Sequence, residues 1–246
     1  MSVVIVTGGS RGIGLAVVEC LLAHGASVVC VSRTAPPLTH PHLLSLTEDL
    51  SAGDLRSVCS RIVDATLSRF GRITAVVNNA GALGNVARFE DVSAAEYHKN
   101  WVVNFAAPVE LVRAALDELR VSRGRVINVS SGAAVKGYPG WSAYCASKAA
   151  LKMWTESLAA EERAIVAINF RPGVVDTEMQ KQIRETGARG MGSDTHARFV
   201  GLHENKQLLP PSTPGNKIAY LCLHGTSEQS GEFIDVSDEN IPLTFK

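Results

Sequence analysis

Short apolar runs alternate with longer amphipathic stretches along this chain of 246 residues. Buried strands typically appear as apolar runs of about four to eight residues, and helices as longer stretches with apolar positions three and four apart. On this basis we expect strands at residues 3–6, 27–31, 43–46, 73–78, 125–130, 165–170 and 232–236. We expect helices at residues 12–24, 52–70, 94–119, 142–162 and 217–223, and 94–119 is either one long helix or two that join near Asn104. The alternation predicts a single α/β domain over residues 1–246, in which a doubly wound parallel sheet of about seven strands carries helices on both faces.

The stretch from Thr177 to about Leu209 departs from this alternation. It combines several glycines and mixed charges with only scattered apolar residues. It also follows the C-terminal end of a predicted strand, where open α/β sheets bind their ligands. Long irregular segments in compact domains are usually functional or disordered. We therefore predict a mobile substrate lid at about 177–209, and the alternative is a solvated insertion without a role.

Composition narrows the range of partners. Lysine and arginine together number 24, as do aspartate and glutamate, so the balanced charge gives no sign of a nucleic-acid partner. No apolar stretch approaches membrane-spanning length, and residues 1–6 lack the length and basic flank of a signal peptide. The five cysteines form no Cys-x-x-Cys pair, and the histidines show no metal-ligand spacing. We expect reduced thiols, no metal and no membrane contact, in a cytoplasmic protein.

A glycine-rich turn separates the first predicted strand from the first predicted helix. Glycines let the backbone approach a pyrophosphate, and a helix N-terminus offers unpaired N–H groups and a favourable dipole. The strand–turn–helix context favours a dinucleotide site of the Rossmann type over a purely structural turn. The residues that we expect at the cofactor from this turn are Thr7, Gly8, Ser10, Arg11, Gly12, Ile13 and Gly14.

Tyr144 and Lys148 stand four residues apart in a predicted helix, which places both side chains on one face. A tyrosine ordinarily ionises near pH ~10, and an ammonium fixed beside it lowers its pKa. We therefore expect Tyr144 to serve as an acid or base at neutral pH. Ser131 lies upstream of the pair, directly after the apolar run 125–130.

Several motifs in order resemble the short-chain dehydrogenase/reductase family, in its single-domain branch. They are the glycine turn, Asn78-Asn79-Ala80-Gly81, Ser131, the Tyr144–Lys148 pair and Pro172-Gly173. The resemblance covers essentially the whole chain. It implies a Rossmann-type fold and an oxidoreductase that transfers hydride between a nicotinamide cofactor and a small carbonyl compound.

The resemblance also implies the role of each catalytic residue. Tyr144 exchanges the proton of the substrate oxygen, while Lys148 holds Tyr144 in its low-pKa state and binds the nicotinamide ribose. Ser131 donates a hydrogen bond to the oxygen where negative charge develops, and Ser130 is the alternative to it. Asn104 resembles the residue that positions a water near Lys148. An asparagine that bonds the backbone at a helix kink is the other interpretation of Asn104.

The choice between the two nicotinamide cofactors follows from charge. The second predicted strand ends at Ser32 and Arg33, without the acidic residue that accepts hydrogen bonds from the ribose 2′-hydroxyl in NAD sites. Arg33 and Arg11 are placed to pair with a 2′-phosphate, because guanidinium–phosphate contacts are charge-assisted and often bidentate. We therefore predict NADP(H), and a solvated loop charge is the alternative for Arg33. Asp49 resembles the family's aspartate that contacts the adenine ring, but it is equally consistent with a turn residue.

Further cofactor contacts come from the resemblance alone. Asn79, Ala80 and Gly81 resemble the motif that borders the adenosine ribose. Thr177 resembles the threonine that bonds the nicotinamide carboxamide. The other residues implied at the cofactor are Tyr144, Lys148, Pro172, Gly173 and Val175.

Three segments, 171–180, 199–205 and 231–238, resemble the group of fungal benzil reductases and sepiapterin reductases. This resemblance implies reduction of an α-dicarbonyl or aromatic ketone, such as benzil, by NADPH. Trp141 could line the pocket beside the reacting carbonyl, with apolar surface from the lid at Met179, Met191 and Phe199. A tail aspartate, Asp238 or its neighbour Asp235, is the candidate for a substrate contact, and a solvated acid is the alternative.

Two other functions stay open: an NADPH-binding redox sensor without significant turnover, and a dedicated biosynthetic reductase for a pterin or another metabolite. The intact Ser131, Tyr144 and Lys148 argue against the sensor. The resemblance implies a homodimer or homotetramer that assembles through helices containing 112–119 and 144–158.

Overall fold

A parallel sheet forms the centre of the molecule. The computed structural model describes residues 1–51 and 53–245, and within these ranges seven strands join in the order β3-β2-β1-β4-β5-β6-β7. Every pairing is parallel. The strands are β1 (Val3–Thr7), β2 (Ser27–Ser32), β3 (Leu43–Thr47), β4 (Ala75–Asn78), β5 (Arg125–Val129), β6 (Val166–Arg171) and β7 (Phe233–Asp235). The sheet confirms the predicted doubly wound fold, and the order changes direction at β1, beside β4.

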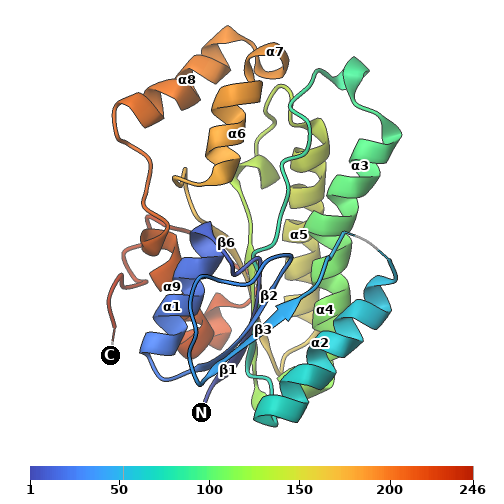
Figure 1. Ribbon diagram of the computed structural model, residues 1–246, viewed down its shortest axis with the longest axis vertical. Helices are drawn as coiled ribbons and strands as arrows, with labels where there is room; N and C mark the ends of the chain where they lie inside the picture. Colours follow the sequence, from blue (N-terminus) through green and yellow to red (C-terminus); the bar gives the residue numbers. More distant parts are fainter. Residues whose placement is uncertain (52, 246) are drawn as a thin grey trace.

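Helices connect the strands and cover both faces of the sheet (Figure 1). On one side lie α1 (Gly12–Ala23) and α9 (Ser212–His224), which pack against each other. On the other side lie α2 (Leu55–Phe70), α4 (Ala107–Ser122) and α5 (Ser142–Glu161). No helix in the described part of the chain combines the length and the apolar character needed to cross a membrane.

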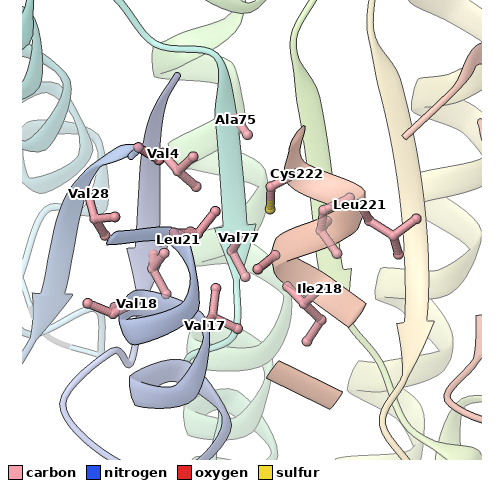
Figure 2. Packing of buried hydrophobic residues seen from close by; sticks show 14 of the residues in the cluster. Val4, Val17, Val18, Leu21, Val28, Ala75, Val77, Ile218, Leu221 and Cys222 are labelled. Atoms are coloured by element: carbon pink, nitrogen blue, oxygen red, sulfur yellow. The ribbon is translucent and has the colours of Figure 1, made fainter. Parts of the chain in front are cut away.

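Two apolar clusters fill the spaces between the sheet and its helices. Figure 2 shows the first, where Val17 and Leu21 of α1 and Ile218 of α9 meet strand side chains such as Val4 and Val77. The central strands are buried on both faces, which explains why they appear in the sequence as unbroken apolar runs. These two layers hold the carboxyl ends of the strands in fixed positions, and the loops there build the site.

The long predicted helix at 94–119 is divided where Asn104 lies. Helix α3 (Ala94–Trp101) passes into a π-helical turn (Val102–Ala106), and α4 then continues to Ser122. A π turn inside a helix frequently marks a functional site. The predicted junction near Asn104 is therefore confirmed.

The segment 177–209 is helical, so the prediction of an irregular stretch is wrong. It forms α6 (Glu178–Thr186), α7 (Ala188–Met191) and α8 (Ser193–Glu204), which lie together beyond one end of the sheet (Figure 1). Of the glycines that suggested a loop, Gly187 and Gly192 lie at helix boundaries, Gly190 lies in α7 where the loop at Val86 comes close, and Gly201 lies inside α8. Apolar side chains in this segment, such as Ile183 and Phe199, are buried against loops distant in sequence. Movement of this segment as a lid stays a prediction.

Candidate active site

A cleft of about 970 Å³ lies at the carboxyl ends of the strands. It extends from the turn after β2, across the turns after β1 and β4, to the helices α5 and α6. The polar end begins at Arg33 and the apolar end lies beneath α6. This position beside the change of strand direction is where doubly wound sheets bind ligands.

The glycine turn forms the floor of the polar end. Gly8 and Gly12 have φ angles of +67° and +55°, which only glycine adopts readily. A Cβ on Gly14 would lie 2.3 Å from the Gly8 carbonyl oxygen, so the first turn of α1 packs directly on the loop. The turn thus requires glycine both for its backbone conformation and for its close packing.

Two residues predicted at the cofactor support this turn from behind and do not line the cleft. The hydroxyl of Thr7 donates to the Val77 carbonyl and accepts from the backbone N–H groups of Asn79 and Ala80. Gly14 faces Gly8 and the Asn79 side chain, whose amide donates to the Thr7 carbonyl. Both positions are occupied in joining β1 to β4 and neither lines the cleft, so the contact of Thr7 and Gly14 with the cofactor stays a prediction.

The N-terminus of α1 is open to the cleft. Arg11 precedes the helix without a side-chain capping hydrogen bond, and the first turn of α1 contains no acidic residue. Gly12, Ile13, Ser10 and Arg11 all line the cleft here. Uncapped N–H groups together with the helix dipole suit a pyrophosphate, so the residues present fit a dinucleotide.

The far polar end carries basic side chains beside one turn-forming acid. Asp49 accepts hydrogen bonds from the N–H and hydroxyl of Ser51, at 2.8 and 2.6 Å. These bonds, with smaller contributions from Arg33 and Lys99, hold the pKa of Asp49 below its usual value. Asp49 is therefore a turn residue that also lines the cleft, and its contact with the adenine ring stays a prediction. The hydroxyl of Ser32 donates to the Thr34 carbonyl and shapes the loop that presents Arg33.

Helix α5 brings Tyr144 and Lys148 together at the middle of the cleft. Both side chains are buried, and the Lys148 Nζ lies 5.9 Å from the centre of the Tyr144 ring. That Nζ donates a hydrogen bond of 2.8 Å to the Val129 carbonyl at the end of β5. The bond anchors the lysine to the sheet and fixes the position of the helix face that carries Tyr144.

The predicted lowering of the Tyr144 pKa is not what the structure gives. Burial raises the pKa of Tyr144 to about 12, and a hydrogen bond with the Ser131 hydroxyl opposes this rise only in part. Burial also lowers the pKa of Lys148 to about 8. Desolvation outweighs charge attraction here, because the ammonium bonds a backbone carbonyl and its charge is itself disfavoured. Tyr144 is consequently protonated at neutral pH, the form that a proton donor requires.

Ser131 and Ser130 both reach the cleft but differ in their surroundings. Ser131 caps a short 3-10 turn, where its hydroxyl accepts from the Ala133 N–H at 3.1 Å. Its own proton is therefore available to Tyr144 or to a substrate oxygen. The Ser130 hydroxyl is buried without a hydrogen-bond partner among the described residues. The influence of Ser131 on the pKa of Tyr144 favours Ser131 over Ser130, and its catalytic role stays a prediction.

Asn104 lies behind the cleft, where its amide ties three segments together. Its Oδ1 accepts from the Ala82 N–H at 2.9 Å, and its Nδ2 donates to the Ala82 carbonyl at 2.9 Å. Nδ2 also lies within hydrogen-bond distance of Asn100 and Ser147. The interpretation as a backbone-bonding residue at a helix irregularity is confirmed. Asn104 itself does not line the cleft, and a water near Lys148 stays a prediction.

The remaining predicted cofactor residues line the middle of the cleft. Asn79, Ala80 and Gly81 do so from the turn after β4. The other four come from the segment after β6, and they are Pro172, Gly173, Val175 and Thr177. Thr177 also faces Gly12 across the cleft, 3.3 Å from where a Cβ on that glycine would lie. The glycine turn and the segment before α6 therefore approach each other closely over the predicted pyrophosphate position.

An aromatic wall encloses the other end of the cleft. The Trp141 ring stands edge-on to Tyr144, with centroids 6.0 Å apart and planes at 89°. It also packs against Tyr138 and Phe199, at 4.8 and 5.4 Å between centroids. The buried members of this third cluster are Leu83, Val86, Ala133, Trp141, Tyr144, Ile183, Met191 and Phe199. Trp141 and Met179 line the cleft, whereas Met191 and Phe199 are buried in this cluster and do not line it.

The two tail aspartates lie outside the cleft. Asp235 forms an ion pair with Arg171 and accepts from Ser237. The side chain of Asp238 accepts from Asn240, and its carbonyl accepts from Lys217. Neither of the two acids lines the cleft, and these bonds hold the tail against β6 and α9.

Sequence reasoning missed several residues that line the cleft, including Leu83, Lys99, Gln180 and Arg184. Lys99 lies on α3, which has no motif that marks a ligand. Gln180 and Arg184 are spaced one turn apart, which would have placed them on one face if the segment had been read as a helix. The helical spacing of Gln180, Ile183 and Arg184 was the signal available.

Comparisons with known proteins agree with this geometry. The family model described as short chain dehydrogenase matches residues 2–188. An uncharacterized oxidoreductase of Schizosaccharomyces pombe, C30D10.05c, is 37% identical over 236 residues, with 95% of each chain covered. Benzil reductase ((S)-benzoin forming) IRC24 of Saccharomyces cerevisiae is 35% identical over 260 residues, with 97% of each covered.

A solved structure shares the whole architecture. The crystal structure of the short chain dehydrogenase/reductase YIR035C from Saccharomyces cerevisiae superposes with a TM-score of 0.93 at 35% identity, with 98% of each chain covered. The chain therefore belongs to the short-chain dehydrogenase/reductase family. It is an oxidoreductase that uses a nicotinamide cofactor, as the resemblance of its motifs implied.

Proposed function

We propose that this protein is an NADPH-dependent carbonyl reductase that reduces a ketone to a hydroxy compound. The substrate class is an α-dicarbonyl or an aromatic ketone such as benzil. The observation that carries the proposal is the meeting of Ser131, Tyr144 and Lys148 beneath an aromatic wall, midway along a cleft whose other end is basic. The similarity to a benzil reductase over nearly the full length supports the substrate class.

The side chains of this site suit reduction of a carbonyl group. When bound, the dinucleotide supplies the hydride, and the protein supplies position and protons. Ser131 donates a hydrogen bond to the carbonyl oxygen, where negative charge develops. Tyr144 is protonated at neutral pH even at the ordinary pKa of a tyrosine, and burial raises its pKa further to about 12, so it can give its proton to that oxygen. Lys148 stays close enough to stabilise the resulting phenolate, and Asn104 holds the turn at Ala82 in place.

Preference for NADPH over NADH rests on charge at the polar end of the cleft. Arg33 and Arg11 are both exposed there and line the cleft, and neither forms an ion pair within the described residues. Lys99 adds a third cation near Asp49. A 2′-phosphate would find two guanidinium groups that are free to bind it. The acids that line this end of the cleft are Glu48, which pairs with Arg61, and the turn-bound Asp49.

The test is oxidation of NADPH by the purified protein with a panel of ketones, followed by absorbance. We expect turnover with benzil and related diketones, and slower turnover with NADH. Tight binding of NADPH without oxidation by any ketone or aldehyde would instead support the redox sensor. A far higher kcat/KM for one metabolite, such as a pterin, than for any diketone would support the dedicated biosynthetic reductase.

We also propose a homodimer or homotetramer in the cytoplasm. Trp101 and Met153 are large apolar side chains that are 43% and 60% exposed, on α3 and α5. Ala143 and Ala146 of α5 join Trp101 in lining a shallow apolar hollow. The five cysteines all lie within the described ranges as free thiols, in keeping with a reducing compartment. Sedimentation velocity distinguishes dimer, tetramer and monomer.

A further inference from the structure

Three buried polar atoms at the substrate end of the cleft have no hydrogen-bond partner within the described ranges. They are Trp141 Nε1, Gln180 Oε1 and Arg184 Nη1. All three side chains line the cleft. Buried polar groups in native proteins nearly always have partners, so three unpaired ones in one cavity indicate that a ligand or ordered water completes them.

These atoms lie on two elements that face the reacting group. Gln180 and Arg184 are one helical turn apart on α6, so they share a face, and Gln180 is only 8% exposed. Ile183, beside them on the same helix, packs in the apolar cluster that contains Trp141 and Tyr144. Trp141 precedes α5 and stands edge-on to the Tyr144 ring. The three polar atoms therefore belong to the two elements, α6 and the start of α5, whose apolar residues Ile183 and Trp141 share one cluster with Tyr144.

The chemistry of the three groups favours an oxygen acceptor. Trp141 Nε1 and Arg184 Nη1 are donors that cannot accept, and the Gln180 amide presents either an oxygen or an NH2 group after rotation. Arg184 forms no ion pair within the described residues, whereas Arg61, Arg113, Arg120 and Arg171 each pair with an acid. The acid nearest in sequence that also lines the cleft is Glu178, at the first position of α6. A half-buried guanidinium without a partner acid is suited to a carbonyl or carboxylate oxygen.

We propose that Trp141 and Arg184 form a subsite for a second oxygen of the substrate, on the carbon next to the carbonyl that is reduced. The inference rests on the proposed function and deepens it. The preferred substrates are then vicinal dicarbonyls in which one group is apolar: a diketone, or a 2-oxo acid whose carboxylate pairs with Arg184. Gln180 closes the polar side of this subsite, and the aromatic wall takes the apolar group.

The experiment compares three ketones with one phenyl group each: propiophenone, 1-phenylpropane-1,2-dione and phenylglyoxylate. A second carbonyl makes a ketone intrinsically more reactive, so the diagnostic quantity is the change in kcat/KM ratios between variants, not the ratio in the natural protein. The variants are R184M, which removes the guanidinium and keeps an unbranched apolar side chain, and W141F, which removes the indole N–H and keeps an aromatic ring. Arg189→Met is the matched control, because Arg189 is exposed on α7 and does not line the cleft.

For R184M we expect kcat/KM to fall roughly 10- to 100-fold for phenylglyoxylate and roughly 3- to 10-fold for the dione, because hydrogen bonds to charged groups are the stronger ones. For W141F we expect about a 3- to 10-fold fall for the dione. Propiophenone should change less than about 3-fold in either variant, as should every substrate in R189M. A larger loss for phenylglyoxylate identifies a carboxylate as the second oxygen, and an equal or larger loss for the dione identifies a keto oxygen.

Equal losses for all three ketones, or none, would overturn the subsite while leaving the reductase proposal in place. If the natural protein reduces no ketone, the proposed function fails, and the subsite is then judged by binding alone. Quenching of tryptophan fluorescence by phenylglyoxylate, with the protein saturated with NADP⁺, gives that binding constant. R184M should weaken binding about 10-fold relative to R189M, and equal affinities would reject the subsite.

Discussion

The two ends of the cleft are built in different ways. The nucleotide end consists mainly of backbone, in the turns after β1, β2 and β4. Close contacts, such as that between Gly14 and Gly8, require glycine there. The substrate end consists of side chains from separate parts of the chain, which include Leu83, Trp141 and Ile183, and Phe199 packs behind them. A shared cofactor needs an invariant backbone shape, whereas an individual substrate needs a particular set of side chains. We therefore expect substitutions at one end to change cofactor binding and substitutions at the other end to change substrate binding.

Tyr144→Phe should have the largest effect, because Tyr144 lies where the two ends meet. Loss of the proton donor should lower kcat by about 10²- to 10⁴-fold. Binding of NADPH, measured by its fluorescence, should change little. Tyr138→Phe is the control, because it removes a hydroxyl from the same aromatic wall. Undiminished turnover in Tyr144→Phe would contradict the assignment of the donor.

Arg33→Asp should alter the nucleotide end alone. The variant removes a guanidinium and introduces a carboxylate that repels a 2′-phosphate and accepts from a 2′-hydroxyl. The ratio of kcat/KM for NADPH to that for NADH should fall by roughly 10- to 100-fold, because the loss of one charge-assisted hydrogen bond weakens binding by about that factor. KM for the ketone should stay constant. An unchanged cofactor ratio would show that Arg33 is a solvated charge.

Gly14→Ala tests the close packing beneath the same end. The new methyl group would lie 2.3 Å from the Gly8 carbonyl oxygen, so the turn must shift. Overpacking of this kind costs about 1–3 kcal/mol, and we expect urea unfolding to show that loss together with weaker NADPH binding. Gly137→Ala is the control, since a Cβ there meets nothing within 4 Å. Equal behaviour of the two variants would argue against a required close approach.

Gly190→Ala should disturb the substrate end and spare the nucleotide end. A Cβ on Gly190 would lie 2.7 Å from the Val86 carbonyl oxygen, where α7 packs on the loop after β4. The KM for the ketone should rise several-fold, which corresponds to a loss of about 1 kcal/mol in substrate binding. The dissociation constant of NADPH should stay constant. Gly137→Ala serves again as the control. A weakened NADPH complex would show that the two ends are coupled through α7.

Lys148→Met should reveal how much the burial of the Lys148 ammonium lowers the free energy of unfolding. This is the smallest of the expected effects. The folded-state pKa of Lys148 is about 8 and its ordinary value is 10.5, so the unfolded chain binds more protons between these values. The free energy of unfolding contributed by this group therefore rises with pH from about 8 upward. We expect the natural protein to gain about 1 kcal/mol relative to Lys148→Met between pH 7.5 and 9 in urea unfolding. Buried thiols titrate equally in both proteins and cancel in the difference. Parallel pH profiles would show that the Lys148 pKa is not lowered.

Sequence pattern alone determined the fold and the nucleotide end. The alternation of apolar runs and amphipathic stretches predicted the seven parallel strands, and short motifs located Ser131, Tyr144 and Lys148. These signals are local, because a strand, a glycine turn and a pair of residues four apart can each be recognised within one short stretch of sequence. Even there, the position of Thr7 and Gly14 behind the turn was decided by packing between β1 and β4.

Tertiary structure decided the substrate end and the ionisation of the site. The residues 177–209 looked irregular because α6, α7 and α8 carry few apolar residues of their own and acquire a buried face only against distant loops such as that at Val86. Trp141 and Arg184, whose unpaired atoms are distant in sequence, line one cleft for the same reason. Nearness of Lys148 to Tyr144 could be read from spacing, but the direction of the tyrosine pKa could not, because desolvation depends on everything packed around the pair.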